Sequence, residues 1–302
     1  MISLSTSGFY ERATRQMGTL RAQADDLQRQ IGTGQRLARS SDDPVAAARL
    51  RTLERGQRLA EIDQRNSDVA ASDLALTDDA LGSIANVIIR AQELATQAAN
   101  DTLSDSQRAS IGTDIANLQQ SLLLVVNGRD SAGHALFGGQ VAGAAYELVD
   151  GAYAYVGTAT KDGVDLGAGQ SVVPALTGPE VLGVEVGGAQ TDLLAVLGGL
   201  AAALRGGGDG SAAARDALDG LAAGLDKVTT GQTVVGARLG SIELMNDRRT
   251  ANSELAAQEQ QAVGGADLAQ TMTRLQEAMT VLEASQASFV RLAGLSLFDM
   301  MR

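Results

Sequence analysis

The chain has 302 residues and a formal net charge of −12, and it contains neither cysteine nor tryptophan. The absence of cysteine excludes disulfides, thiolate metal sites and cysteine nucleophiles, and the acidic balance argues against binding to nucleic acid or to an anionic membrane. Aromatic residues make up only 3% of the chain, so small aliphatic side chains must fill its core, as in long layers of helices.

An amphipathic helix is predicted from about Phe9 to Gln35. Apolar residues recur there at alternating steps of three and four, which places them on one side of an α-helix. Gly32 and Gly34 weaken the end of this helix. The apolar stripe consists of Tyr10, Ala13, Met17, Leu20, Ala24, Leu27 and Ile31.

A polar turn follows this helix. Ser41 or Asp42 is expected to cap the next helix by accepting hydrogen bonds from its free N-H groups, and Pro44 suits the first helical turn. The adjacent carboxylates of Asp42 and Asp43 are interpreted as capping groups. A metal or acid-base site is disfavoured because adjacent side chains face different ways and no histidine or Glu cluster is nearby.

The helical pattern continues from the turn to about Asn100. A capping box between Ser104 and Gln107 then predicts another helix, whose apolar spacing extends to Val125. Nearly all of the first 126 residues are therefore expected to be helical.

The composition changes at Asn127, where glycines become frequent and β-forming residues alternate around turn residues. The stretch from about Leu136 to Val186 is predicted to form a small β-domain or a set of hairpins. His134, the single histidine, lies in the glycine-rich loop before it. It is interpreted as a loop residue, because no cysteine or second histidine could complete a metal site.

Helical pattern resumes from about residue 192 to 204, pauses in the glycine-rich segment 206–211, and runs again from 212 to about 261. Gly264 and Gly265 separate this helix from a last amphipathic helix. An apolar stripe must be buried against another surface, so the two terminal helices are expected to pair with each other or with other copies of the chain. The C-terminal stripe consists of Leu268, Met272, Leu275, Met279, Leu282 and Phe289, interrupted at Gln286.

Three segments resemble the flagellin superfamily and, within it, the hook-filament junction family. Residues 31–50 contain DDPVA, where filament flagellins usually read DDAAG. Residues 88–124 are similar to both groups. The segment LSLFDMMR, residues 295–302, resembles the LSLFDYL ending that is typical of the junction family.

The resemblance implies a mainly α-helical fold with a central β insert, in which the N- and C-terminal halves form a long antiparallel coiled-coil rod. It also implies three domains. Residues 1–40 with 265–302 would form a terminal coiled-coil assembly domain, residues 41–132 with 190–264 a helical rod domain, and residues 133–189 an outward β-rich insert.

The function implied by the resemblance is structural: a component of the bacterial flagellum that joins the hook-associated layer to the flagellin filament by coiled-coil packing of subunits. The expected partners are neighbouring copies of the chain, the adjacent hook-associated protein, flagellin and a flagellar export chaperone. No enzyme activity, cofactor, metal, nucleic acid or membrane is expected. The N-terminus lacks the basic and apolar regions of a cleaved signal peptide, so type III export to the extracellular flagellum is implied.

Two alternatives remain open. A filament flagellin is disfavoured by Pro44 and by the LSLFD ending. A surface adhesin whose insert binds glycan is disfavoured because few aromatic residues could stack on sugar rings. Subunit contacts are expected at Tyr10, Met17, Leu20, Leu27, Ile31, Leu268, Met272, Leu275, Met279, Leu282, Phe289, Leu295, Leu297 and Phe298.

Overall fold

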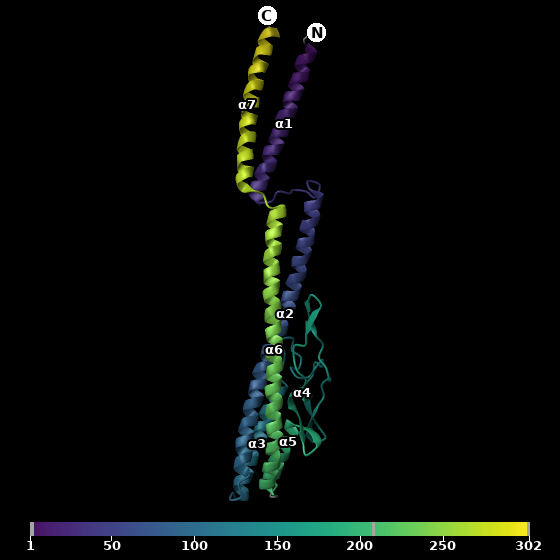
Figure 1. Cartoon of the computed structure of the whole chain (residues 1–302), viewed down its shortest axis with the longest axis vertical. Coiled ribbons are helices and arrows are strands. Elements are labelled where there is room, and N and C mark those ends of the chain that lie inside the picture. The colour runs from purple at the N-terminus through teal and green to yellow at the C-terminus, as the bar shows by residue number, and fades with distance from the viewer. Residues whose placement is uncertain (1–2, 207–208, 301–302) are drawn as a thin grey trace. The chain divides into compact units, whose positions relative to one another are not determined.

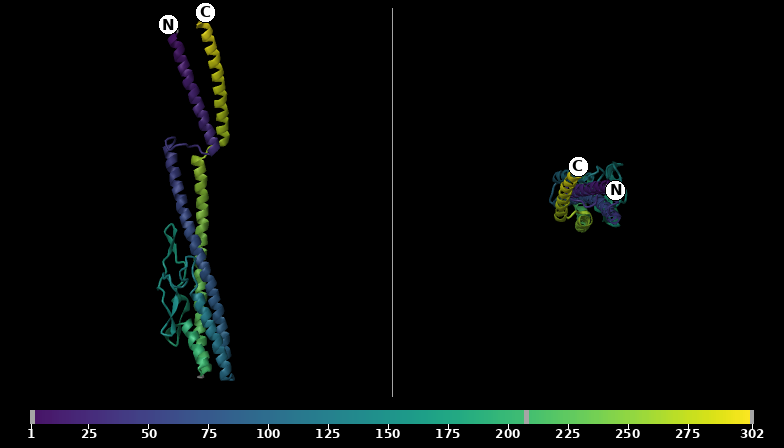
Figure 2. Two further views of the ribbon diagram at one scale, coloured as in Figure 1. Left: turned by 180° about the vertical axis from the view of Figure 1, so that it is seen from behind. Right: turned by 90° about the horizontal axis from the view of Figure 1, so that it is seen from above.

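The computed structural model describes residues 3–206 and 209–300, with the side chains of residues 3–7, 9 and 292–300 left out of the description. The chain divides into two compact units. The first unit contains residues 1–59 and 251–302, and the second contains residues 60–250. Both ends of the chain, purple and yellow in Figures 1 and 2, therefore belong to one unit.

Helices dominate both halves of the chain, as the apolar spacing predicts, and the prediction of a mainly α-helical fold with a central β insert is confirmed. The first helix begins at Ser3, earlier than the predicted Phe9, and the second runs without a break to Ala98. The helices are α1 (Ser3–Thr33), α2 (Pro44–Ala98), α3 (Asp105–Val126), α4 (Gly178–Leu182), α5 (Leu193–Arg205), α6 (Gly210–Gly264) and α7 (Leu268–Met300).

Side-chain caps fix the starts of α3 and α5. Ser104 forms the predicted capping box: its hydroxyl oxygen accepts the Gln107 N-H at 3.4 Å, and the Gln107 side chain accepts the Ser104 N-H at 2.9 Å. Asp192 caps α5 by accepting the Ala195 N-H at 2.9 Å. These bonds satisfy N-H groups that have no partner within the helix, which is why both helices start where they do.

The second unit has an apolar core shared by α2, α3, α5 and α6. Gly112 lets α3 and α5 approach closely, because a Cβ at this position would meet the Leu204 Cβ at 2.9 Å. The apolar residues of each helix recur at helical spacing, so they lie on one face and are buried together. Fully buried members include Leu74, Leu81, Ile84 and Ile88 of α2 and Leu221, Val228 and Val235 of α6.

The predicted β-domain consists of three separate two-stranded antiparallel hairpins. Asp150 and Gly151 form the turn of the first hairpin with positive φ at both positions. This geometry matches the twist of antiparallel strands. The strands are β1 (Tyr146–Val149) paired with β2 (Ala152–Tyr155), β3 (Val164–Gly167) with β4 (Gln170–Val172), and β5 (Gly183–Val186) with β6 (Ala189–Asp192).

Two arginines of α6 fasten the insert to the helices of the second unit. Arg238 donates to the carbonyl oxygens of Val173 and Ala175 at 3.1 and 3.0 Å, and Arg249 donates to the Leu166 carbonyl oxygen at 2.8 Å. Figure 1 shows the insert, in teal, lying alongside α6. These charge-assisted bonds satisfy carbonyl groups that short hairpins cannot pair among themselves.

Candidate functional site: the terminal helix pair

In the first unit α1 packs against α7, and Figure 1 shows both chain ends at the same end of this terminal helix pair. The stripe predicted on α1 supplies the packing face. Ala24 and Leu27 are buried, and the other members of the stripe are half-buried. The rings of Tyr10 and Phe289 meet edge-on, with centroids 5.3 Å apart. The α1 stripe therefore packs on α7 within one chain, whereas only Leu275, Leu282 and Phe289 of the predicted α7 stripe are buried or half-buried.

α7 turns the small residues beside its leucines towards α1. Thr271 and Ala278 are each 6% exposed and Leu282 is 8% exposed, whereas Met272 and Met279 are 59% and 39% exposed. Small side chains let two helices approach closely, which explains why this side is chosen. Two lines of residues at steps of three and four run along α7, and both include Leu275, Leu282 and Phe289. We call the line that also contains Thr271, Ala278 and Ser285 the small seam. The line that also contains Met272, Met279 and Gln286 is the large seam.

The residues expected to make subunit contacts divide between these surfaces. Leu275, Leu282 and Phe289 are buried or half-buried in the terminal helix pair. Leu268, at 48% exposure, and both methionines of the large seam remain exposed in the single chain. Leu295, Leu297 and Phe298 belong to α7, but their side chains lie outside the described residues. Their role in subunit contact stays a prediction.

Sequence reasoning missed the small seam. Thr271, Ala278 and Ser285 keep the same steps of three and four from Leu275 and Leu282 as the methionines do on the other side. Hydrophobicity alone favours the methionines. The small size of these side chains could have identified the packing face, because a line of Thr, Ala and Ser beside leucines is typical of helices that approach closely.

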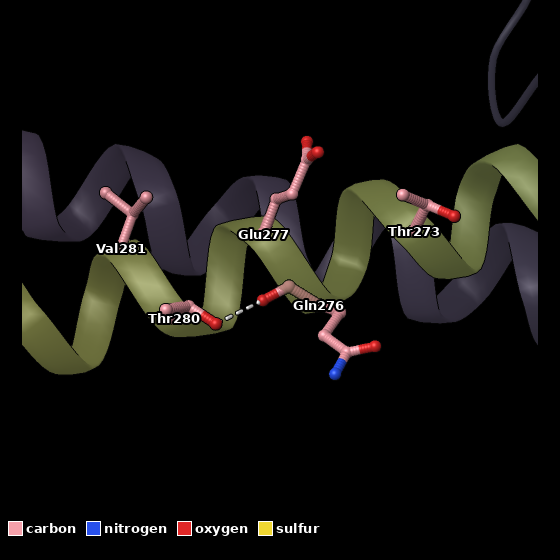
Figure 3. Close-up of a pocket in the computed structure, with 5 residues that line it drawn as sticks. All are labelled: Thr273, Gln276, Glu277, Thr280 and Val281. Carbon is pink, nitrogen blue, oxygen red and sulfur yellow. Dashed lines mark hydrogen bonds between the residues drawn. The ribbon is translucent and has the colours of Figure 1, made fainter.

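A shallow groove on the outer surface of α7 is lined by this single helix (Figure 3). The Thr280 hydroxyl donates to the Gln276 carbonyl oxygen at 2.9 Å, so its polar contact is internal to the helix. A substrate site needs several polar groups that converge from different elements, whereas the residues that line this groove all come from α7. Its lining residues are Thr273, Gln276, Glu277, Thr280 and Val281.

Two backbone hydrogen bonds tie together the connections that lead into and out of the terminal helix pair. The Arg36 N-H donates to the Gly264 carbonyl oxygen at 2.8 Å, and the Ala266 N-H donates to the Gly34 carbonyl oxygen at 2.9 Å. Gly34 has a φ of 68°, which residues with a side chain adopt only with strain. Residues 34–36 and 264–266 thus form a clasp at the end of the pair.

Asp43, rather than the predicted Ser41 or Asp42, caps α2. Its carboxylate accepts the Ala46 N-H at 3.0 Å and a bond from Arg36 at 3.2 Å. The hydrogen bond from Ala46, followed by that from Arg36, lowers the pKa of the Asp43 carboxyl. Asp42 accepts two N-H groups of the preceding turn instead. The interpretation of the pair as helix-capping groups is confirmed for Asp43, and the prediction that Ser41 or Asp42 caps α2 is wrong.

Within residues 3–206 and 209–300, no group of three or more His, Asp or Glu side chains could hold a metal ion. None of the helices in these ranges combines the length and the hydropathy needed to cross a membrane. His134 lies in the predicted loop, half exposed, with its Nδ1 atom 3.8 Å from the Asp130 carboxylate. The geometry around it is that of a loop contact.

The sequence has recognisable relatives. Residues 4–142 match a family described as the bacterial flagellin N-terminal helical region. Flagellar hook-associated protein 3 of Escherichia coli (strain K12) is 27% identical in an alignment that covers 98% of this chain and 98% of that protein. The second similarity extends beyond residue 142, through the hairpins and the C-terminal half of the chain.

Solved structures share the fold. A Vibrio parahaemolyticus protein described as flagellar hook-associated has a TM-score of 0.68 at 24% identity, over 73% of this chain and 98% of that chain. The flagellar junction protein FlgL from Legionella pneumophila has a TM-score of 0.61 at 16% identity, over 72% of this chain and 100% of that chain. At these identities the likeness is one of fold.

Proposed function

We propose that the chain is a member of the flagellin superfamily, homologous to flagellar hook-associated protein 3 along nearly its whole length, and that it is a structural component of the bacterial flagellum. It joins the hook-associated layer to the flagellin filament by coiled-coil packing between subunits. The observation that carries this proposal is the alignment over 98% of both chains. The matched segment 4–142 alone would suit a filament flagellin equally well.

The terminal helix pair supplies the contacts between subunits. Its small seam is used within the chain, while Leu268, Met272 and Met279 expose large apolar side chains at coiled-coil spacing. Burial of such surface contributes about 25 cal/mol per Å² on association. The α1 residues Met17 and Leu20 are only half-buried in the single chain, so the exposed part of each can contact a neighbouring subunit.

The partners follow from this position in the flagellum. Neighbouring copies pack side by side, and the adjacent hook-associated protein and flagellin occupy the two faces of the resulting layer. The subunit reaches the outside of the cell through the flagellar type III apparatus with the help of an export chaperone. Its role is structural: it holds these partners together by non-covalent contacts.

The domain organisation follows the same logic. Residues 1–40 with 265–302 form the assembly domain, residues 41–132 with 190–264 the helical rod, and residues 133–189 the outward insert. Two observations support the boundaries: the clasp at residues 34–36 and 264–266 interrupts the helices, and the three hairpins lie within or next to the third range.

A charge on the large seam tests the assembly surface. The double variant Met272→Asp with Met279→Asp should block subunit packing, because desolvating a carboxylate in an interface costs several kcal/mol. Both positions are exposed in the single chain, so the thermal unfolding curve and the secreted amount should be unchanged while filaments are absent. Ala284→Asp, at an exposed position on the face of α7 away from both seams, is the matched control and should assemble normally. Normal swimming of the double variant would remove the large seam from the interface.

A gene deletion tests the function as a whole. Cells without the protein should retain hooks and shed flagellin into the medium, since nothing then connects the two. The purified protein should form no long filaments by electron microscopy, because a junction subunit meets different neighbours above and below and cannot repeat head to tail. Long filaments of this chain alone would identify it as a filament flagellin instead.

A further inference from the structure

The side chain of Asn127 connects the end of α3 to the start of β1. Its Oδ1 atom accepts the N-H groups of Ala145 and Tyr146, both at 2.9 Å, and its Nδ2 atom donates to the Tyr146 carbonyl oxygen at 3.0 Å. On its other side, β1 pairs with β2, with Tyr146 opposite Tyr155. The carboxamide therefore takes the place that a peptide group of a third strand would occupy at the free edge of β1.

Asn127 is followed by Gly128, the only Asn-Gly dipeptide in the sequence. Asn-Gly is chemically labile because glycine has no Cβ to shield its backbone nitrogen or to restrict the backbone. That nitrogen can attack the Asn127 Cγ atom, so that a C-N bond forms, a proton is transferred and the side-chain nitrogen leaves as ammonia. Water then opens the cyclic imide to aspartate or isoaspartate. The sequence of steps consumes one water and requires no oxidant or cofactor.

The folded chain holds both reacting groups away from this geometry. The backbone of Asn127 has φ −93° and ψ 11°, and the Gly128 N-H donates to the Val125 carbonyl oxygen at 3.0 Å. Ring closure would have to break this backbone bond and the three carboxamide bonds together. We propose that Asn127 deamidates spontaneously when the insert is unfolded, and that folding of the insert protects it from this reaction.

The product would be unable to restore the native contacts. An aspartate side chain has no N-H to donate, so the carbonyl group of the buried Tyr146 would lose its partner and face a carboxylate oxygen. A buried carbonyl without a donor destabilises the folded state. Isoaspartate also adds a methylene group to the backbone between α3 and the insert. Deamidation in the unfolded chain therefore interferes with docking of the first hairpin.

The test compares the full chain in native buffer and in denaturing urea at the same mildly alkaline pH. Peptide mass spectrometry resolves the mass gained when an amide becomes an acid. Deamidation at Asn127 should be at least about tenfold faster in urea than in the native protein, because only the opened chain reacts. Gly128→Ala should slow the reaction in urea. Equal rates in both conditions, or no reaction at Asn127 in urea, would overturn the proposal.

A variant that carries the product tests the structural consequence. Asn127→Asp should refold with an insert that proteases cleave faster and with a lower midpoint of urea unfolding. Asn252→Asp is the matched control, because Asn252 is exposed on α6, and it should leave both properties unchanged. An Asn127→Asp protein indistinguishable from the wild type would show that the carboxamide does not hold β1. If the variant fails to fold, the urea comparison on the wild-type chain still decides the proposal.

Discussion

Gln57 of α2 and Gln260 of α6 bind each other reciprocally through their side-chain amides. The Gln260 Nε2 donates to the Gln57 Oε1 at 3.0 Å, and the Gln57 Nε2 donates to the Gln260 Oε1 at 3.3 Å. Between the same two helices, Arg49 and Glu259 form a two-pronged ion pair at 2.6 and 2.8 Å. Only one alignment of the two helices gives these four side chains their hydrogen-bond partners. The two pairs, which we call the polar seam, therefore fix the register of α2 and α6 in the first unit.

Removal of one glutamine should therefore destabilise this seam more than removal of both. Gln57→Leu leaves the Gln260 amide without a partner and should lower the free energy of unfolding of the helix segment by about 1 kcal/mol. Gln57→Leu with Gln260→Leu replaces the pair by apolar contact and should recover that loss. Hydrogen exchange of the α2 amides in the wild type, Gln57→Leu, Gln260→Leu and the double variant measures the coupling. Strictly additive effects would mean that the two amides do not depend on each other.

A charge in the small seam should separate the terminal helices without unfolding the second unit. Leu282 is buried against α1, so Leu282→Asp places a carboxylate where desolvation costs several kcal/mol. Brief trypsin treatment should then cut at Arg12, Arg21 and Arg274, while residues 60–250 stay resistant. Val290→Asp is the control, because Val290 is 69% exposed and its substitution should not change the digest. Resistance of the Leu282→Asp chain at all three arginines would contradict the packing.

Asp130 should stabilise the fold at neutral pH. Burial raises the pKa of its carboxyl, but the bond from Lys161 at 3.1 Å and the N-H groups of His134 and Ala132 outweigh burial, so the pKa lies below its ordinary value. A lowered folded pKa contributes stability above the unfolded value of 3.8, and this is lost as the pH falls through the folded pKa. Asp130→Asn should lower the free energy of unfolding by about 1–3 kcal/mol at pH 7.

Urea denaturation at a series of pH values measures this effect. The difference between Asp130→Asn and the wild type should shrink as the medium becomes more acidic than the unfolded pKa. Asp162→Asn, at an exposed position of the same insert, should show no such trend. A difference that is independent of pH would mean that the charge of Asp130 is not what stabilises the loop.

Asp192 should behave in the opposite way. Burial raises the pKa of its carboxyl, although the N-H groups of Ala195 and Leu194 act against the shift. The folded state therefore disfavours the charged form, and the contribution of this group is most favourable at acidic pH and declines as the pH rises through the folded pKa. Asp192→Asn keeps an acceptor for the N-terminus of α5 and should raise the free energy of unfolding at pH 7.

The same pH series tests this prediction. The advantage of Asp192→Asn should disappear at acidic pH, where the wild-type carboxyl is protonated. A loss of stability at neutral pH would show that the negative charge favours the helix end more than burial opposes it.

Most helix limits could be predicted, because they depend on neighbours in the sequence. The capping box at Ser104 and the break at Gly264 involve residues within a few positions of one another. The hairpins were harder to place, since glycine turns predict their existence but not their pairing. The strands continue to Asp192, past the predicted Val186, because the last hairpin leads directly into α5.

The amino-acid sequence by itself determined that both ends are amphipathic helices, that a β insert interrupts the helices, and that the chain resembles flagellar junction proteins. These properties follow from spacing and local motifs. Only the tertiary structure decided which side of α7 faces α1, because close approach depends on the size of side chains on both helices at once. It also decided the partners of Asn127, Arg238 and Arg249, since those side chains bind backbone groups that are distant in the sequence and carry no local signal.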